Sequence, residues 1–237
     1  MTTTQNTLNF LAELAQNNNK DWFNANKVWY NDVRSEFESL VARLIDGISK
    51  FDEDLKHTTV KECVFRIHRD TRFSHDKTPY KTHFGAYIAS NGGRKSPRAG
   101  YYLHLEPKAS FVASGVWMPE PNVLKALRKS VYDNIDELKE IITKDEFSQY
   151  YKTFYSEDAL KKIPAGFPKD FPDADLLKLK HYIVECNLSE DLLMSDDFEN
   201  RMLKIFKAGH PFNHFLNHTI DELIKSEPKI NSQDFQF

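Results

Sequence analysis

The stretch FGAYIASNGGRKSPRAGYYLHLEPKASFVASGVW, residues 84–117, decides the fold of this chain. Apolar and polar side chains alternate with the period of a β-strand in three runs, which cover residues 83–90, 100–107 and 109–117. A glycine-rich loop joins the first two runs, and a short turn near Pro107 joins the last two. Because short connections favour antiparallel neighbours, the stretch predicts a meander of three strands.

Two further segments extend this predicted sheet. ECVFRIH, residues 62–68, alternates, with Phe65 and Ile67 on one face and Arg66 on the other, and predicts a strand before the meander. HYIVECNL, residues 181–188, predicts a strand after it. We therefore expect an antiparallel sheet of about four or five strands in the middle of the chain.

Helical spacing of apolar residues predicts helices on both sides of the sheet. The expected helices cover residues 7–17, residues 20–50, a segment that carries Leu124 to Ile142, a shorter segment in 145–155, a segment that opens at Ser195 and closes at Gly209, and a last one that starts at Pro211. Residues 161–175 hold three prolines and are expected to be irregular. This order predicts an α+β fold, an antiparallel sheet packed against N-terminal and C-terminal helices.

Length and composition predict one soluble domain. The chain has 237 residues, of which 40% are hydrophobic and 28% are charged, so it can bury a core without disulfides or metals. We expect a single domain of residues 1–237 that is helical over 1–55, mainly β over 58–118 and mainly helical over 119–237. No apolar run has the roughly 18 residues of a membrane span. No basic region precedes an apolar one at the N-terminus, and the two cysteines form no CxxC pair, so we expect a cytoplasmic protein without a membrane partner.

Positive charge is concentrated locally in a chain whose net charge is −3. Residues 61–108 hold ten Lys and Arg against four Asp and Glu. Nucleic-acid binders usually carry a basic surface over the whole domain. A basic middle in an acidic chain fits the local field of a small-anion site better, and the sequence therefore disfavours nucleic acid as a partner.

The cations gather in FRIHRDTRFSHDKTPYKTHFGAY, residues 65–87, where Asp70 and Asp76 are the only acids. Guanidinium groups offer forked donors that match a carboxylate or a phosphate. Internal acids or a bound anion must offset the repulsion between these cations. We predict a site for a phosphate- or carboxylate-bearing small molecule, and an internal ion-pair network without a ligand is the alternative. The predicted ligand-binding residues are Arg66, Arg69, Arg72, Lys77, Tyr80, Lys81 and Tyr102.

Proton-transfer candidates lie on the same segment and on a neighbouring strand. They are His68, Asp70 and His104. Strand alternation places Arg66 and His68 on one face of their strand, and Tyr102, His104 and Glu106 on one face of another. We expect these two sets to share one face of the sheet.

These residues leave several functions open. One is an enzyme that acts on the anion, and a second is a non-catalytic protein that senses a metabolite or a nucleotide. The third is a nucleic-acid binder that stacks bases on the tyrosines, which the acidic net charge disfavours. No cofactor motif is present. His210, His214 and His218 recur every four residues, but their positions opposite the apolar stripe predict a solvated helix face and no metal site.

The cation-rich segment resembles an uncharacterised, mainly bacterial protein family, domain of unknown function 2461, in the motif R-x-x-R-D-x-R-F-x-x-x-K-x-P-Y-K. Here the motif consists of Arg66, Arg69, Asp70, Arg72, Phe73, Lys77, Pro79, Tyr80 and Lys81. The opening DWFNANKVWY and the block GGRKSPRAGYYLHLEP are also similar to the family. Two residues after the motif the family has Asn, whereas this chain has His83. The resemblance implies an intact single-domain protein whose motif forms its working site, and it implies no particular reaction, cofactor or substrate.

Overall fold

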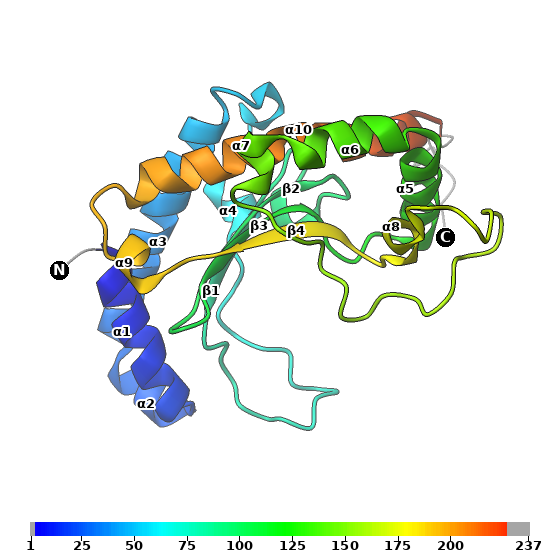
Figure 1. The fold of residues 1–237 in the computed structure, drawn as a ribbon. Helices are drawn as coiled ribbons and strands as arrows, with labels where there is room; N and C mark the ends of the chain where they lie inside the picture. The colour runs from blue at the N-terminus through cyan, green and yellow to red at the C-terminus, as the bar shows by residue number, and fades with distance from the viewer. Residues whose placement is uncertain (1–2, 227–237) are drawn as a thin grey trace, which may run out of the picture.

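A four-stranded antiparallel sheet forms the centre of the molecule (Figure 1). The computed structural model describes residues 3–226. The strands lie side by side in sequence order, β1 (Phe84–Ile88), β2 (Gly100–Leu105), β3 (Phe111–Val116) and β4 (Tyr182–Asn187). Helices precede the sheet and follow it along the chain. The structure therefore confirms the predicted α+β fold with its antiparallel sheet in the middle of the chain.

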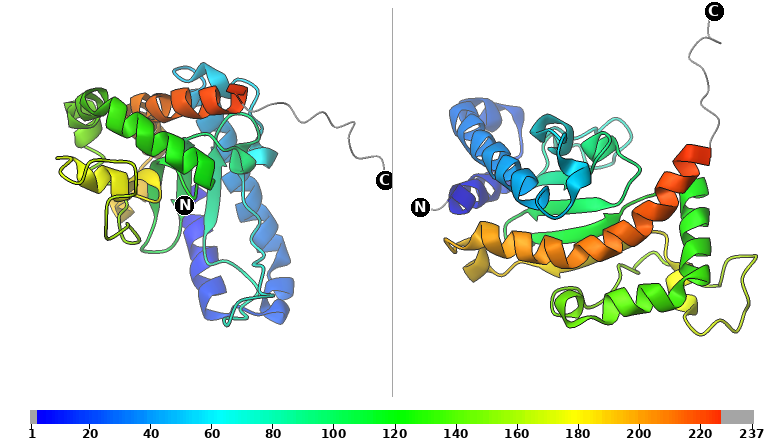
Figure 2. Two further views of the ribbon diagram at one scale, coloured as in Figure 1. Left: turned by 90° about the vertical axis from the view of Figure 1, so that its right-hand side faces the viewer. Right: turned by 90° about the horizontal axis from the view of Figure 1, so that it is seen from above.

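The two faces of the sheet have different surroundings. One face carries Tyr101, Leu103 and Val112, which are buried against α10 (Phe198–Ser226) and α3 (Lys27–Ile48). The other face carries Tyr87, Tyr102 and His104 in register. Figures 1 and 2 show α10 on one side of the sheet, and two long connections, residues 64–83 and 152–173, on the other. Side chains on this second face can therefore line a site instead of a core; it is called the open face below.

The N-terminal region contains three helices where the sequence predicts two. They are α1 (Thr3–Gln16), α2 (Lys20–Ala25) and α3. Asn26 separates α2 from α3, and its side-chain amide donates to the carbonyl of Trp22 at 2.9 Å. Asparagine breaks helices because its amide competes for backbone groups in this way. Phe10 of α1 packs against the rings of Trp22 and Trp29, which joins the three helices.

The C-terminal half follows the predicted order of helices with different bounds. Asn134 divides the expected helix into α5 (Pro121–Asp133) and α6 (Ile135–Thr143). The short elements are η1 (Glu53–Leu55), α4 (Val60–Cys63), η2 (Gly93–Lys95), α7 (Asp145–Ser148), α8 (Ala174–Lys178) and α9 (Glu190–Leu193). Among residues 3–226, no helix combines the length and the apolar character that a membrane span requires.

Helix α10 is continuous, and the predicted break between Gly209 and Pro211 is wrong. Both Pro211 and Lys207, whose carbonyl loses its helical partner, are exposed, so water can satisfy that carbonyl. A side chain at position 209 would place Cβ 2.3 Å from Ser114 Oγ, so glycine lets the helix lie directly on β3. The buried Asn217 side chain also exchanges two hydrogen bonds with the backbone of Ala99. Packing on the sheet therefore outweighs the local helix-breaking signals.

Residues 62–68 do not form the predicted strand. A capping box of Thr59 and Glu62 starts α4, and the extended chain after it makes only single bridges, such as Val64 with Ala86. Lys81 N donates to Ile67 O at 2.8 Å, which pairs this segment with the chain that leads into β1. The result is an irregular hairpin, residues 64–83, whose tip lies far below the sheet in Figure 1. This hairpin carries the whole cation-rich motif.

Candidate functional site

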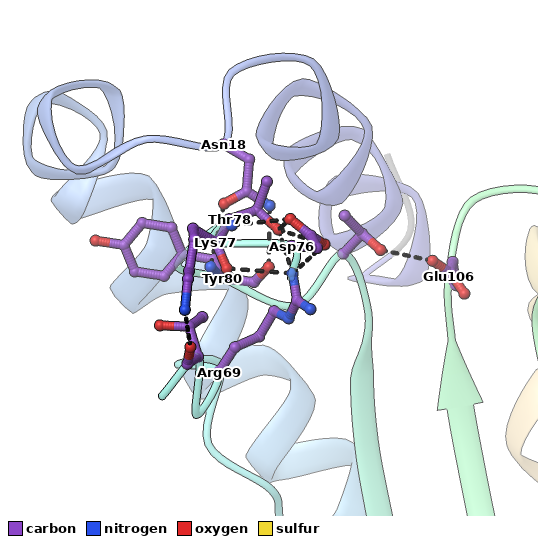
Figure 3. Close-up of polar contacts among 9 residues, drawn as sticks. Asn18, Arg69, Asp76, Lys77, Thr78, Tyr80 and Glu106 are labelled. Carbon is purple, nitrogen blue, oxygen red and sulfur yellow. Dashed lines mark hydrogen bonds and ion pairs between the residues drawn. The ribbon is translucent and has the colours of Figure 1, made fainter. Parts of the chain in front are cut away.

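The tip of the hairpin is a loop that satisfies its own charges. Arg69 Nη1 donates to Asp76 Oδ2 at 2.5 Å and also contacts the side chain of Thr78, as Figure 3 shows. Asp76 Oδ1 accepts from the backbone N–H of Thr78 at 2.9 Å. The Thr78 backbone, followed by the Arg69 guanidinium, lowers the pKa of Asp76 to about 2. Asp76 is therefore held ionised by groups inside the loop itself.

The other tip cations also have partners within the loop. Arg72 forms an ion pair with Asp70 at 2.6 Å, and both side chains are exposed. Lys77 Nζ donates to the carbonyl of Thr71 at 2.9 Å. Hydrogen bonds from Arg72 lower the pKa of Asp70. Three of the five cations predicted to bind an anion are thus engaged in contacts that hold the loop.

Tyr80 anchors the hairpin to the N-terminal helices. Its ring stacks on Phe23 with centroids 4.0 Å apart, and only 5% of the residue is exposed. The amide of Asn18 exchanges hydrogen bonds with the Tyr80 backbone, donating to the carbonyl at 2.9 Å and accepting from the N–H at 3.1 Å. His68 lies beside these rings, and burial lowers its pKa. The motif tyrosine therefore acts as a packing residue in this structure.

A groove of about 870 Å³ lies between the base of the hairpin, α3 and η2, and we call it the cation groove. Its lining includes six cations and one acid, in the set Arg34, Glu38, Val60, Lys61, Val64, Phe65, Arg66, Lys81, Arg94 and Lys95. Arg34 pairs with Glu38 at 2.6 Å, and Arg94 donates to the carbonyls of Lys61, Glu62 and Val64. These arginines shape the wall of the groove.

Arg66 and Lys81 are the motif cations that remain for a ligand. Within residues 3–226, neither forms an ion pair or a hydrogen bond through its side chain. Lys81 Nζ lies 5.2 Å from the centroid of the Phe65 ring. Burial, and then the charge of Arg66, lower the pKa of Lys81. Lys81 is half-buried and Arg66 is exposed. The two cations repel each other, and a bound anion would relieve that repulsion.

The open face of the sheet holds a second cavity of about 550 Å³, which we call the aromatic cleft. Its lining is Phe65, His83, Tyr87, Arg94, Ser96, Gly100, Tyr102, His104, Phe111, Ala113, Ser114, Gly115, Val116, Trp117, Tyr155, Ile183 and Glu185. The lining combines small residues, such as Gly100 and Ala113, with aromatic rings. Gly115 has φ +122°, and a Cβ there would lie 1.9 Å from the carbonyl oxygen of Tyr182, so only glycine fits.

Tyr102, His104 and Glu106 form a hydrogen-bonded row at one end of the cleft, as strand alternation predicted. His104 Nδ1 lies 3.0 Å from the Tyr102 hydroxyl, and His104 Nε2 lies 3.0 Å from Glu106 Oε2. Burial lowers the pKa of His104. Burial acts to raise the pKa of Glu106, but hydrogen bonds from His104 and Thr82 lower it below its usual value.

His83 joins this row, which the sequence reading missed. Its ring stacks on that of His104 with centroids 4.3 Å apart, and burial lowers its pKa to about 4. The pairing of Phe84 with Leu105 brings position 83 beside Glu106, and this register is not readable from the local sequence pattern. Arg34, Trp117 and Tyr155 were also missed, since they come from distant parts of the chain.

The groove and the cleft are neighbours. Phe65 and Arg94 line both, and the Phe65 ring stands 6.3 Å from that of Tyr102. His68 and Asp70 are absent from the residues that line either cavity in the described chain. The structure thus places Arg66 and Lys81 in one cavity and Tyr102 and His104 in the next, with a phenyl ring between them.

These features define an α+β protein whose antiparallel sheet is covered by helices on one face and carries a ligand-sized cleft on the other. Over residues 6–215 the chain matches the family described as conserved hypothetical protein, domain of unknown function 2461, and it belongs to that family. This confirms the resemblance that the motif indicated. No curated protein and no solved structure matches the chain.

Proposed function

We propose that the protein binds a small molecule whose phosphate or carboxylate group contacts Arg66 and Lys81. The observation that carries the proposal is the pair of unpartnered cations in the cation groove. Charged side chains that stay close together without an acid cost free energy, which a ligand anion recovers through charge-assisted hydrogen bonds. A hydrogen bond to a charged group contributes about 1.5–3 kcal/mol.

The aromatic cleft supplies the second half of the proposed site. Its volume of about 550 Å³ lies within the usual range of small-molecule sites, roughly 300–1,000 Å³. Its lining combines aromatic rings with polar groups from several elements, among them Arg94, His104 and Glu185. A ligand with an anionic group in the groove and a flat or apolar body in the cleft would pass the ring of Phe65, which both cavities share.

Binding followed by catalysis is the second candidate function. His104 is 8% exposed and is held between the Tyr102 hydroxyl and the Glu106 carboxylate at the end of the cleft. An imidazole fixed between a hydroxyl and a carboxylate is an arrangement that enzymes use for proton transfer. His68 and Asp70 are the weaker candidates for this role, because they line neither cavity.

A thermal-shift panel of phosphate, nucleotides, sugar phosphates and dicarboxylates at low salt tests the proposal. A ligand at 100 times its Kd stabilises the fold by about 2.7 kcal/mol, which raises Tm by roughly 5–10 °C for a chain of this size. We expect Arg66→Ala to abolish the shift and Lys81→Met, through an affinity about tenfold weaker, to reduce it to about half. Arg72→Ala is the matched control, because it removes a cation from the same hairpin that already has Asp70 as its partner.

The control also decides between the groove and the loop. If Arg72→Ala or Arg69→Ala removes the shift and Arg66→Ala keeps it, the anion binds at the hairpin tip, as the sequence alone predicts for Arg69, Arg72 and Lys77. If no anion shifts Tm for the wild-type protein, the proposal is wrong and the motif is a structural network.

A further inference from the structure

We propose that His83, His104 and Glu106 form a binding site for a divalent transition-metal ion at the end of the aromatic cleft. One ligand atom from each residue lies within 4.8 Å of the others. His104 is buried, and His83 and Glu106 are half-buried. The inference goes beyond the proposed function, because it assigns a metal ion to one end of the cleft and does not depend on Arg66 and Lys81 or on whether an anion binds.

The hydrogen bonds around the cluster orient two of the three ligands. The Tyr102 hydroxyl lies 3.0 Å from His104 Nδ1, so Nδ1–H can donate to it while Nε2 faces Glu106. Thr82 Oγ1 donates to Glu106 Oε1 at 2.7 Å, which leaves Oε2 for a metal. Figure 3 shows this bond to Glu106. Such outer hydrogen bonds fix tautomer and orientation at protein metal sites, and their loss typically weakens metal affinity 10–100-fold.

The donor set indicates the class of ion. Two imidazoles and one carboxylate suit Zn²⁺, Fe²⁺ and related first-row ions, whereas Mg²⁺ and Ca²⁺ prefer oxygen ligands. Three protein ligands leave at least one coordination position open. Both His83 and His104 line the aromatic cleft, so the open position would face the cavity in which we place the ligand.

Metal binding requires the side chains to move together. Bonds of about 2.1 Å at a tetrahedral ion place two ligand atoms about 3.4 Å apart. Ligand atoms that now lie up to 4.8 Å apart must therefore approach each other by up to about 1.4 Å, which rotation of the side chains has to supply. His104 Nε2 lies 3.0 Å from Glu106 Oε2, and in the Nε2–H tautomer it donates to that carboxylate oxygen. The ion would take the place of that proton, with the Nδ1 tautomer donating to Tyr102.

The test is Zn²⁺ and Co²⁺ binding by the full chain after treatment with a chelator. Calorimetry should show one equivalent of Zn²⁺ bound to the wild-type protein, and Co²⁺ should give a visible absorption band. His83→Phe keeps a ring stacked on His104 but removes a ligand, and we expect it to weaken Zn²⁺ binding at least about 100-fold and to abolish the band. Tyr102→Phe should weaken it about 10–100-fold.

His214→Ala is the control for the other histidine cluster. His214 and His218 are exposed on α10 at a spacing that can also hold an ion. The solvated face predicted for the three histidines does not include His210, which is half-buried beside the Tyr101 hydroxyl. Loss of the Co²⁺ band in His214→Ala but not in His83→Phe would overturn the proposal, as would absence of Zn²⁺ binding by the wild-type protein. If His83→Phe fails to fold by circular dichroism, Glu106→Gln gives the same decision, because it keeps the shape of the side chain and removes its charge.

Discussion

The hairpin tip and the cation groove contain cations from the same motif, but the two regions differ in whether those cations have acid partners. At the tip, Arg69 and Arg72 have Asp76 and Asp70 as partners at 2.5 and 2.6 Å. In the groove, Arg66 and Lys81 form no ion pair or hydrogen bond with an acid among the described residues, although the charge of Arg66 contributes to the lowered pKa of Asp70. The difference teaches that a run of cations in a sequence does not by itself mark a ligand site. What matters is which cations remain after the local acids have been paired.

The largest effect should come from removing the anchor that holds both regions in place. We expect Tyr80→Ala to lower the free energy of unfolding by about 3–4 kcal/mol, because a buried ring that stacks on Phe23 is lost. Phe73→Ala, at the 94% exposed position in the same hairpin, should change it by less than about 0.5 kcal/mol. Urea denaturation measures both. Equal effects would mean that the hairpin is not anchored through Tyr80.

Charge reversal at one cation of the groove and one of the hairpin tip compares their contributions to anion binding. Arg66→Glu should weaken the binding of the best anion from the panel at least about 100-fold, since it replaces a charge-assisted contact by repulsion. Arg72→Glu should change the Kd less than about threefold, because Arg72 lies at the hairpin tip and does not line the cation groove. Isothermal titration calorimetry measures both constants. Similar losses in the two variants would erase the distinction between groove and tip.

Lys81→Met tests whether this lysine lowers the stability of the free protein while it contributes to anion affinity. It should weaken the anion about tenfold while raising Tm of the free protein, because a half-buried charge beside Arg66 is removed. The pKa of Lys81 is lowered in the folded state, so the unfolded chain binds the proton more tightly. Stability of the free wild-type protein should therefore rise as pH increases from the lowered pKa toward the ordinary value of 10.5. Lys81→Met should lack this contribution in matched thermal melts.

The smallest effect concerns the tip alone. Asp76 has a pKa of about 2 against an ordinary value of 3.8, so its contribution to loop order is present above pH 3.8 and is lost as pH falls toward 2. Arg69→Ala should raise this pKa toward 3.8, and carboxyl chemical shifts in an NMR titration measure the change. An unchanged pKa would show that the Thr78 backbone alone holds Asp76 ionised.

Sequence reasoning predicted the sheet better than the hairpin, for physical reasons. Strand periodicity and short turns are local, so the strands predicted over 83–90, 100–107, 109–117 and 181–188 each contain an observed strand. The same alternation assigned Tyr102, His104 and Glu106 to one face. The strand predicted over residues 62–68 was wrong, because the capping box at Thr59 starts the helical turn of α4, which the alternation of side chains does not show. The location of His83 beside His104 depends on the register between β1 and β2, which cannot be read from a local sequence pattern.

The errors in the helices have a common cause. Asn26 interrupts a helix through a bond between its own amide and the backbone, whereas Gly209 and Pro211 leave a helix intact because the sheet supports it. Intrinsic propensity is a weak prior that packing can override in either direction. The same argument applies to the site, since no local pattern connects Arg34 on α3 with Arg66 on the hairpin.

The pairing of β4 with β3 has a consequence for how the chain folds during synthesis. Residues 117–181 separate the two strands, so at roughly 5–20 residues per second the ribosome needs on the order of several seconds to deliver β4 after β3 has emerged. During that interval β3 is an unprotected edge, and α10, which covers the apolar face of the sheet, has not yet been made. The nascent chain is therefore most exposed to mispairing while α5 to α8 emerge. Chaperone binding to chains stalled in this interval would be stronger than to chains released after residue 226.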